Sequence, residues 1–155
     1  MTRYEVLLVL HIASAFAFVC AYTMVSALFV ACLRVDGRVD ALALLRLARP
    51  ADVLAWVGAT GTLVFGLALV FDMSIYDLKD GWIVGALVLW LIAEEAIRRE
   101  DLLFKKGRQV VRAGGATDLR DVLHSRHALA LHVIGGAALL GLLVVMIYKP
   151  GAGVG

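Results

Sequence analysis

The chain has 155 residues, of which 62% are hydrophobic, and its mean hydropathy is +0.89. A soluble domain of this size is closer to half apolar, because it must present a mostly polar surface to water. The net charge of +2 is too small to indicate an acidic or a basic partner by itself. The apolar residues lie in long uncharged runs, which predicts an all-α membrane protein without a separate soluble catalytic domain.

Four apolar runs predict a four-helix transmembrane bundle that forms a single membrane domain over residues 1–155. The helices are expected at about 4–33, 51–71, 81–100 and 126–148, with a flexible tail at 149–155. Pro50 suits the first turn of the second helix. The third run is the weakest, because Glu94 and Glu95 follow after only thirteen apolar residues, whereas a span needs about twenty.

The basic residues predict the orientation of the bundle. Twelve of the 15 lysines and arginines fall between the first and second or between the third and fourth helices. They are Arg34, Arg38, Arg46, Arg49, Arg98, Arg99, Lys105, Lys106, Arg108, Arg112, Arg120 and Arg126. Cytoplasmic loops carry such an excess, so both termini are expected on the outer side of a bacterial inner membrane. The segments 34–50 and 101–125 are amphipathic, which predicts that they lie in the headgroup plane on the cytoplasmic side.

Small residues recur every four positions on the second and the fourth helix. They are Gly58, Thr62 and Gly66 on one face of the second helix, and Ala128 and Gly136 on one face of the fourth, which His132 shares. Small residues at this spacing let helix backbones approach closely, which drives helix association in lipid. We therefore expect compact packing, together with contacts to other membrane subunits or to a second copy.

His11 lies in the outer half of the first predicted helix. Ionisable residues at membrane depth are rare, and each is a candidate for function. An imidazole at this depth suits an axial ligand of haem, a ligand of another metal, or a group that binds and releases protons. The alternative is a neutral histidine that is hydrogen-bonded to a neighbouring helix, and one histidine alone does not decide between these hypotheses.

Glu94 and His132 are predicted at similar depths in adjacent helices. At 1.5 Å per residue, His132 lies about 7 Å and Glu94 about 10 Å from the cytoplasmic edge of the membrane. A buried pair would satisfy both groups and could carry a proton. The alternative is that Glu94 and Glu95 each pair with an arginine four residues later, at a thinned interface.

Motifs of common enzyme classes are absent from the sequence. It contains no Walker-type loop, no dinucleotide-binding glycine pattern and no nucleophile elbow. His124 and His127 could begin a metal site, but no cysteine or nearby carboxylate completes one. The basic segments fit a membrane surface better than nucleic acid. We therefore expect no catalytic residue, no metal site and no nucleic-acid partner.

Four short motifs occur along the first two thirds of the chain. They are Leu10-His11-Ile12, Leu47-Ala48-Arg49-Pro50-Ala51, Phe65-Gly66-Leu67-Ala68-Leu69 and Gly81-Trp82. Over about residues 5–100 the chain resembles a family of bacterial integral membrane proteins of unknown function. More distantly it is similar to the HemJ-type protoporphyrinogen oxidases and to CopD-like membrane domains. The resemblance implies that His11 binds haem b. The oxidases also have a lysine at the position of Ala86, so the resemblance argues against oxidase activity.

Three functions follow from these observations. The first is a non-catalytic accessory or scaffolding subunit of a larger membrane complex, which the small-residue faces favour. The second is a membrane protein that binds haem b and carries electrons, with His11 as the axial ligand. The third is a proton-coupled carrier that uses Glu94 and His132. The lack of a catalytic constellation favours the first.

Overall fold

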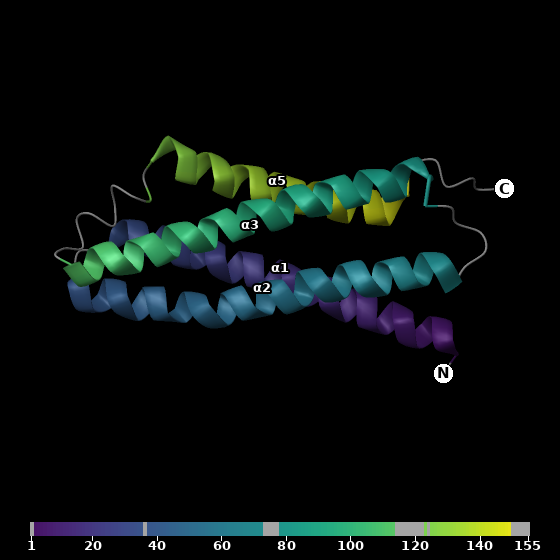
Figure 1. Ribbon diagram of the computed structural model, residues 1–155, viewed down its shortest axis with the longest axis horizontal. Coiled ribbons are helices and arrows are strands. Elements are labelled where there is room, and N and C mark those ends of the chain that lie inside the picture. Colours follow the sequence, from purple (N-terminus) through teal and green to yellow (C-terminus); the bar gives the residue numbers. More distant parts are fainter. Residues whose placement is uncertain (1, 36, 73–77, 114–122, 124, 150–155) are drawn as a thin grey trace.

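The computed structural model describes residues 2–35, 37–72, 78–113, 123 and 125–149 of the chain. Their helices are α1 (Arg3–Arg34), α2 (Arg38–Asp72), α3 (Gly81–Ala113) and α5 (Arg126–Tyr148). The helices lie along one elongated bundle and alternate in direction (Figure 1). We call the end where α1 begins and α5 ends the terminal end, and the opposite end the charged end. The prediction of an all-α four-helix bundle is confirmed.

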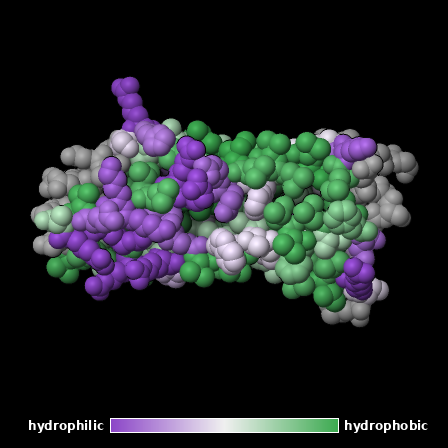
Figure 2. All heavy atoms as spheres, viewed as in Figure 1, coloured by the Kyte–Doolittle hydropathy of each residue, from purple (hydrophilic) through white to green (hydrophobic). Residues whose placement is uncertain are grey.

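Three of the helices are long and apolar enough to cross a membrane. They are α1, α2 from Val39 onward, and α5. Helix α3 is apolar only from Gly81 to Ala93, about 20 Å of helix, before Glu94 and Glu95 interrupt it. On the face shown in Figure 2, hydrophobic residues cover most of the half toward the terminal end, and hydrophilic residues are concentrated on the other half. The membrane-like surface therefore covers only part of the bundle's length.

The helix boundaries differ from the sequence-based expectation near the charged end. Residues 38–50 are the first turns of α2, and residues 101–113 are the last turns of α3, so neither stretch is a separate amphipathic segment. Pro50 accordingly lies inside α2, where it was expected to begin a helix. With 35 and 33 residues, the two helices are about 50 Å long, which exceeds the roughly 30 Å hydrocarbon core of a bilayer. Residues 114–122, 124 and 150–155 lie outside the described residues.

The extended helices enclose a core of their own near the charged end. Its buried members are Val25, Leu28, Phe29, Cys32, Ala41, Leu45, Ala48, Ala51, Phe104, Val111, Leu123 and Ala128. The amphipathic pattern of 38–50 and 101–113 arises because these turns bury one face in this charged-end core and expose the other. An amphipathic pattern is typical of a helix in the headgroup plane. Here the same pattern belongs to helices of the bundle that extend beyond its apolar region.

A second core lies nearer the terminal end and is built from smaller residues. Its buried members are Phe18, Ala21, Ala55, Ala59, Ala86, Ala93, Ile97, Ala138, Leu139 and Leu142, so six of the ten are alanines. The backbones of α1 and α2 are close here, because a Cβ atom added to Gly58 would lie 2.5 Å from the backbone nitrogen of Phe18. The small residues thus serve close helix contact, as their spacing predicts.

Candidate functional site

A cavity of about 700 Å³ lies in the half of the bundle toward the terminal end. All four helices line it, mostly with aliphatic and aromatic side chains that include Phe18, Trp82 and Trp90. Pockets that bind cofactors and other small molecules are usually about 300–1,000 Å³ in volume and mostly apolar. The size and lining of the cavity therefore suit an apolar or amphiphilic ligand.

His11 is the histidine that borders this cavity. Its Nδ1 atom lies 3.0 Å from the backbone carbonyl oxygen of Thr62. A carbonyl oxygen can only accept a hydrogen bond, so Nδ1 carries the proton and donates it. In the neutral imidazole the lone pair then resides on Nε2. The backbone of α2 thus fixes both the position and the tautomer of His11.

Two residues that were predicted to serve helix packing also position His11. Thr62 supplies the carbonyl oxygen, and its hydroxyl donates a 2.7 Å hydrogen bond to the backbone oxygen of Gly58 one turn earlier. At Gly66, an added Cβ atom would lie 3.0 Å from Cε1 of the imidazole ring. The absence of a side chain at Gly66 therefore gives the ring its place against α2.

The residues around the cavity fit haem b. A histidine whose Nδ1–H group is held by a backbone carbonyl has Nε2 left for a metal, as in many sites where histidine binds a metal. The apolar lining suits the faces of a porphyrin. Lys149 also borders the cavity, with its Nζ atom 5.5 Å from the centre of the Trp82 ring, and would supply a positive charge for a propionate group. In the described part of the chain, no three histidine, cysteine or acidic residues are grouped to hold a metal ion.

His132 lies in a different part of the bundle. Its ring is stacked between two aromatic rings of α1, with centroid distances of 5.5 Å to Tyr22 and 4.9 Å to Phe29. These residues follow His11 by eleven and eighteen positions on α1, which corresponds to about 16 and 27 Å along the helix. The two histidines therefore do not share a ligand.

The residue that holds His132 is Glu100, where Glu94 was expected. Nδ1 of His132 lies 3.0 Å from Oε1 of Glu100, whose side chain is 1% exposed. The expectation of a Glu94–His132 pair is corrected here: depths counted along each helix placed Glu94 level with His132, whereas α3 and α5 pack so that Glu100 lies beside it. Glu94 and Glu100 are six residues apart, about 9 Å along the axis, and point in different directions from it.

A signal in the sequence could have identified Glu100. The buried positions of α3 continue at helical spacing through the charged region: Ala93, Ala96, Ile97, Glu100, Phe104, Gly107 and Val111. Glu100 therefore occupies a core position of an apolar stripe, where an unpaired carboxylate would be costly. This periodicity would have identified Glu100 as a buried acidic residue that needs a partner.

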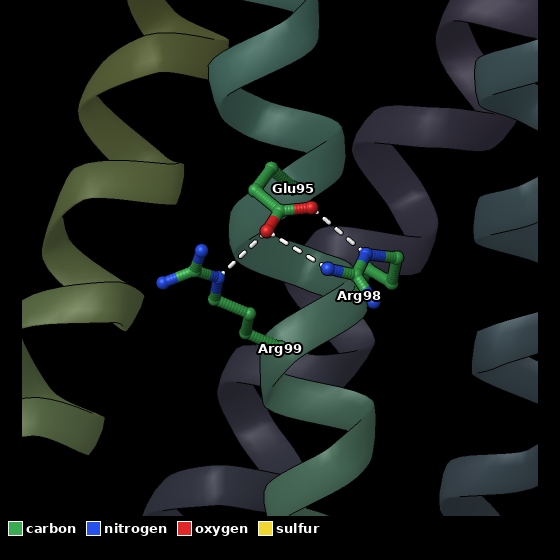
Figure 3. Close-up of polar contacts among 3 residues, drawn as sticks. All are labelled: Glu95, Arg98 and Arg99. Atoms are coloured by element: carbon green, nitrogen blue, oxygen red, sulfur yellow. Dashed lines mark hydrogen bonds and ion pairs between the residues drawn. The ribbon is translucent and has the colours of Figure 1, made fainter.

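Glu95 forms a surface ion-pair network with two arginines (Figure 3). Its carboxylate oxygens accept hydrogen bonds of 2.8 Å from Nε and Nη2 of Arg98, and one of 2.7 Å from Nε of Arg99. The hydrogen bonds from Arg98 and then Arg99 lower the pKa of Glu95 to about 2. The alternative hypothesis paired Glu94 and Glu95 each with one arginine. In the structure Glu95 pairs with both arginines. Exposed pairs of this kind contribute little stability.

Comparison with family models, with curated proteins and with solved structures finds no match to this chain. The likeness to HemJ-type oxidases and CopD-like domains gains no support from these comparisons. Any assignment of function therefore depends on the geometry around His11 and His132. Of the predicted His124–His127 pair, His127 is exposed on α5, and His124 lies outside the described residues.

Proposed function

We propose that this chain is a haem b-binding protein of the bacterial cytoplasmic membrane, with His11 as the axial ligand. One observation carries the proposal: an imidazole held by Thr62 through Nδ1 borders an apolar cavity of about 700 Å³. A histidine that served packing alone would not need a cavity of cofactor size beside it.

The order of the helices supports four membrane crossings. Helices α1, α2 and α5 each have a span of sufficient length and hydropathy. Helix α3 runs from the terminal end, where α2 ends, to the charged end, where α5 begins (Figure 1). If its neighbours cross the bilayer, α3 crosses with them. The excess of lysine and arginine near the charged end supports a cytoplasmic location for that end.

The chain's own residues would perform the binding. Bound haem b would supply a one-electron carrier. His11 would orient the group, and the Thr62 carbonyl would keep Nε2 unprotonated. The aliphatic and aromatic lining would exclude water and thereby influence the reduction potential.

The function of an accessory or scaffolding subunit has less support. Its main motivation was the presence of small-residue faces that could receive a partner. An added Cβ atom at Gly58, Gly66 or Gly136 would meet Phe18, His11 or Tyr22, all on α1 of the same chain. These faces are therefore occupied within the bundle and give no reason to invoke another subunit.

The test is a visible absorption spectrum of the detergent-purified protein, expressed with ample haem, before and after addition of dithionite. We expect a Soret band that shifts on reduction, together with sharpened α and β bands. The variant His11→Ala should lose the bound haem, and exogenous imidazole should restore part of it, which separates a lost ligand from a lost fold. His127→Ala is the matched control and should keep full occupancy. A flat wild-type spectrum overturns the proposal.

A further inference from the structure

Glu100 is a fully buried acidic residue in the middle of the bundle. Its side chain is 1% exposed, one oxygen contacts His132, and the other oxygen, Oε2, has no hydrogen-bond partner. An isolated carboxylate in such surroundings is strongly disfavoured, because the low-dielectric interior does not solvate its charge. Glu100 therefore needs a compensating proton or a compensating positive charge, and His132 is placed to provide it.

The Glu100–His132 pair is neutral only when it carries one ionisable proton. Without that proton the pair has a charge of −1, and with two it has a charge of +1. Either state leaves a net charge in an apolar interior. The single-proton state is therefore the one that the surrounding residues stabilise, and the remaining question is which of the two side chains holds the proton.

The aromatic rings beside His132 favour the histidine. Phe29 and Tyr22 lie nearly parallel to the imidazole, with interplanar angles of 3° and 12°. A cation that lies over aromatic faces is attracted by their negative π-clouds, and the attraction is stronger away from water. The Tyr22 hydroxyl donates a hydrogen bond to the backbone oxygen of His132, which holds the two residues together. An imidazolium ion is thus stabilised by Glu100 at its edge and by aromatic rings at its faces.

We propose that Glu100 and His132 form a proton-binding site in which His132 is held as an imidazolium cation between Tyr22 and Phe29. This site is separate from the cavity beside His11 and does not depend on haem. It connects three helices, because Tyr22 and Phe29 come from α1, Glu100 from α3 and His132 from α5.

Other charged groups near this site interact with one another or face outward. On α2, the half-buried Asp52 interacts with Asp101, the chain neighbour of Glu100. On α3, Arg99 pairs with Glu95, and Asp101 pairs with Lys105 and lies 4.0 Å from Arg108. On α5, Arg126 and His127 are exposed. On α1, Tyr22 is the titratable side chain stacked on His132, and the buried Cys32 thiol belongs to the same core as Phe29. Among the described residues, Glu100 is the acidic group in contact with His132.

The test is nitrogen NMR of the protein labelled with ¹⁵N-histidine, at about pH 7.5, one unit above the ordinary imidazole value of about 6.5. We expect both ring nitrogens of His132 to be protonated, and exposed His127 gives a separate signal. The variants His127→Gln and His132→Gln assign the two signals. In Glu100→Gln, the imidazolium signal of His132 should be lost, since the compensating charge is gone.

Glu94→Gln is the matched control, because it removes a carboxylate from the same helix without touching His132. It should leave the His132 signal unchanged. A neutral His132 ring in the wild-type protein overturns the proposal, and so does an imidazolium that persists in a folded Glu100→Gln variant. The wild-type spectrum is decisive even if Glu100→Gln does not fold.

Discussion

Near the charged end, α1, α2 and α3 bury Cys32, Leu45 and Val111 completely, while the outer faces of α2 and α3 carry lysine, arginine and acidic side chains. Toward the terminal end, the same helices expose large apolar residues such as Phe16 and Phe71, at 70% and 72%, and enclose a cavity. One half thus has the polarity of a water-soluble bundle and the other the polarity of a membrane protein. No helix ends at the boundary between these two halves.

The contrast indicates that different forces hold the two halves together. In water, burial of large side chains stabilises a bundle, and the charged-end core contains Leu45, Phe104 and Leu123. In lipid that force is missing between helices, and close approach of small residues replaces it. The alanine-rich second core and the contact at Gly58 belong to this second kind of packing. The following substitutions test the difference.

The largest effect is expected in the charged-end core. Phe104 is 1% exposed, and Phe104→Ala would leave a void there. Substitutions of this kind cost about 3–5 kcal/mol. Leu102→Ala is the matched control, because Leu102 lies on the same helix and is 51% exposed. Thermal unfolding in mild detergent should separate the two variants clearly. Equal melting temperatures would show that this half has no packed core.

The next effect concerns the contact between α1 and α2. Gly58→Ala should destabilise the bundle by about 1–3 kcal/mol, because the new methyl group meets the backbone of Phe18 and forces the helices apart. Gly85→Ala is the control, since an added Cβ atom there meets nothing within 4 Å. We expect this control to be neutral or stabilising, because alanine has the higher helix propensity. The same unfolding measurement applies, and a tolerated Gly58→Ala would contradict the close contact.

A smaller difference is expected between two buried alanines that are both enlarged to leucine. Ala48 is 0% exposed in the charged-end core, so Ala48→Leu should overpack it and cost about 1–3 kcal/mol. Ala86 borders the cavity, and a leucine there can extend into the existing space. We expect Ala86→Leu to change the free energy of unfolding by less than about 1 kcal/mol. If Ala86→Leu destabilised the protein more than Ala48→Leu, the space beside Ala86 would have to be occupied by other side chains in solution.

The smallest effect is expected for Glu95→Gln. Because Arg98 and Arg99 lower the pKa of Glu95, the folded state gains stability above the unfolded value of about 4.3 and loses it as the pH falls toward 2. The group is exposed, so the gain is slight. Melting curves of the wild type and the variant should therefore converge at low pH. A difference in melting temperature that grows as the pH falls would contradict the predicted direction of the pH dependence.

The number of helices and the polarity of their surfaces could be predicted from the sequence, because uncharged runs indicate contact with lipid and basic residues indicate contact with water. It misplaced the start of α2, since Pro50 is tolerated inside that helix as well as at a first turn. The partner of His132 was missed because depth was counted separately along each helix, and such counts do not give which residues of α3 and α5 lie side by side. The contact of His11 with Thr62 uses a backbone carbonyl, which every residue has, so no residue type reveals it. The cavity depends on how four helices are spaced, which local patterns do not encode.

The cavity beside His11 has some of its lining in common with the outer surface of the apolar half. Ile12, Phe16 and Ile147 border the cavity, yet they are 57%, 70% and 74% exposed. In a bilayer these side chains would meet acyl chains, so an apolar ligand of this cavity would reach it by lateral diffusion from the lipid phase. Its occupancy is then set by how strongly it partitions into the bilayer, and much less by its aqueous solubility. Detergent acts as a competing solvent for such a ligand, so apparent affinity should fall as the number of micelles per protein rises.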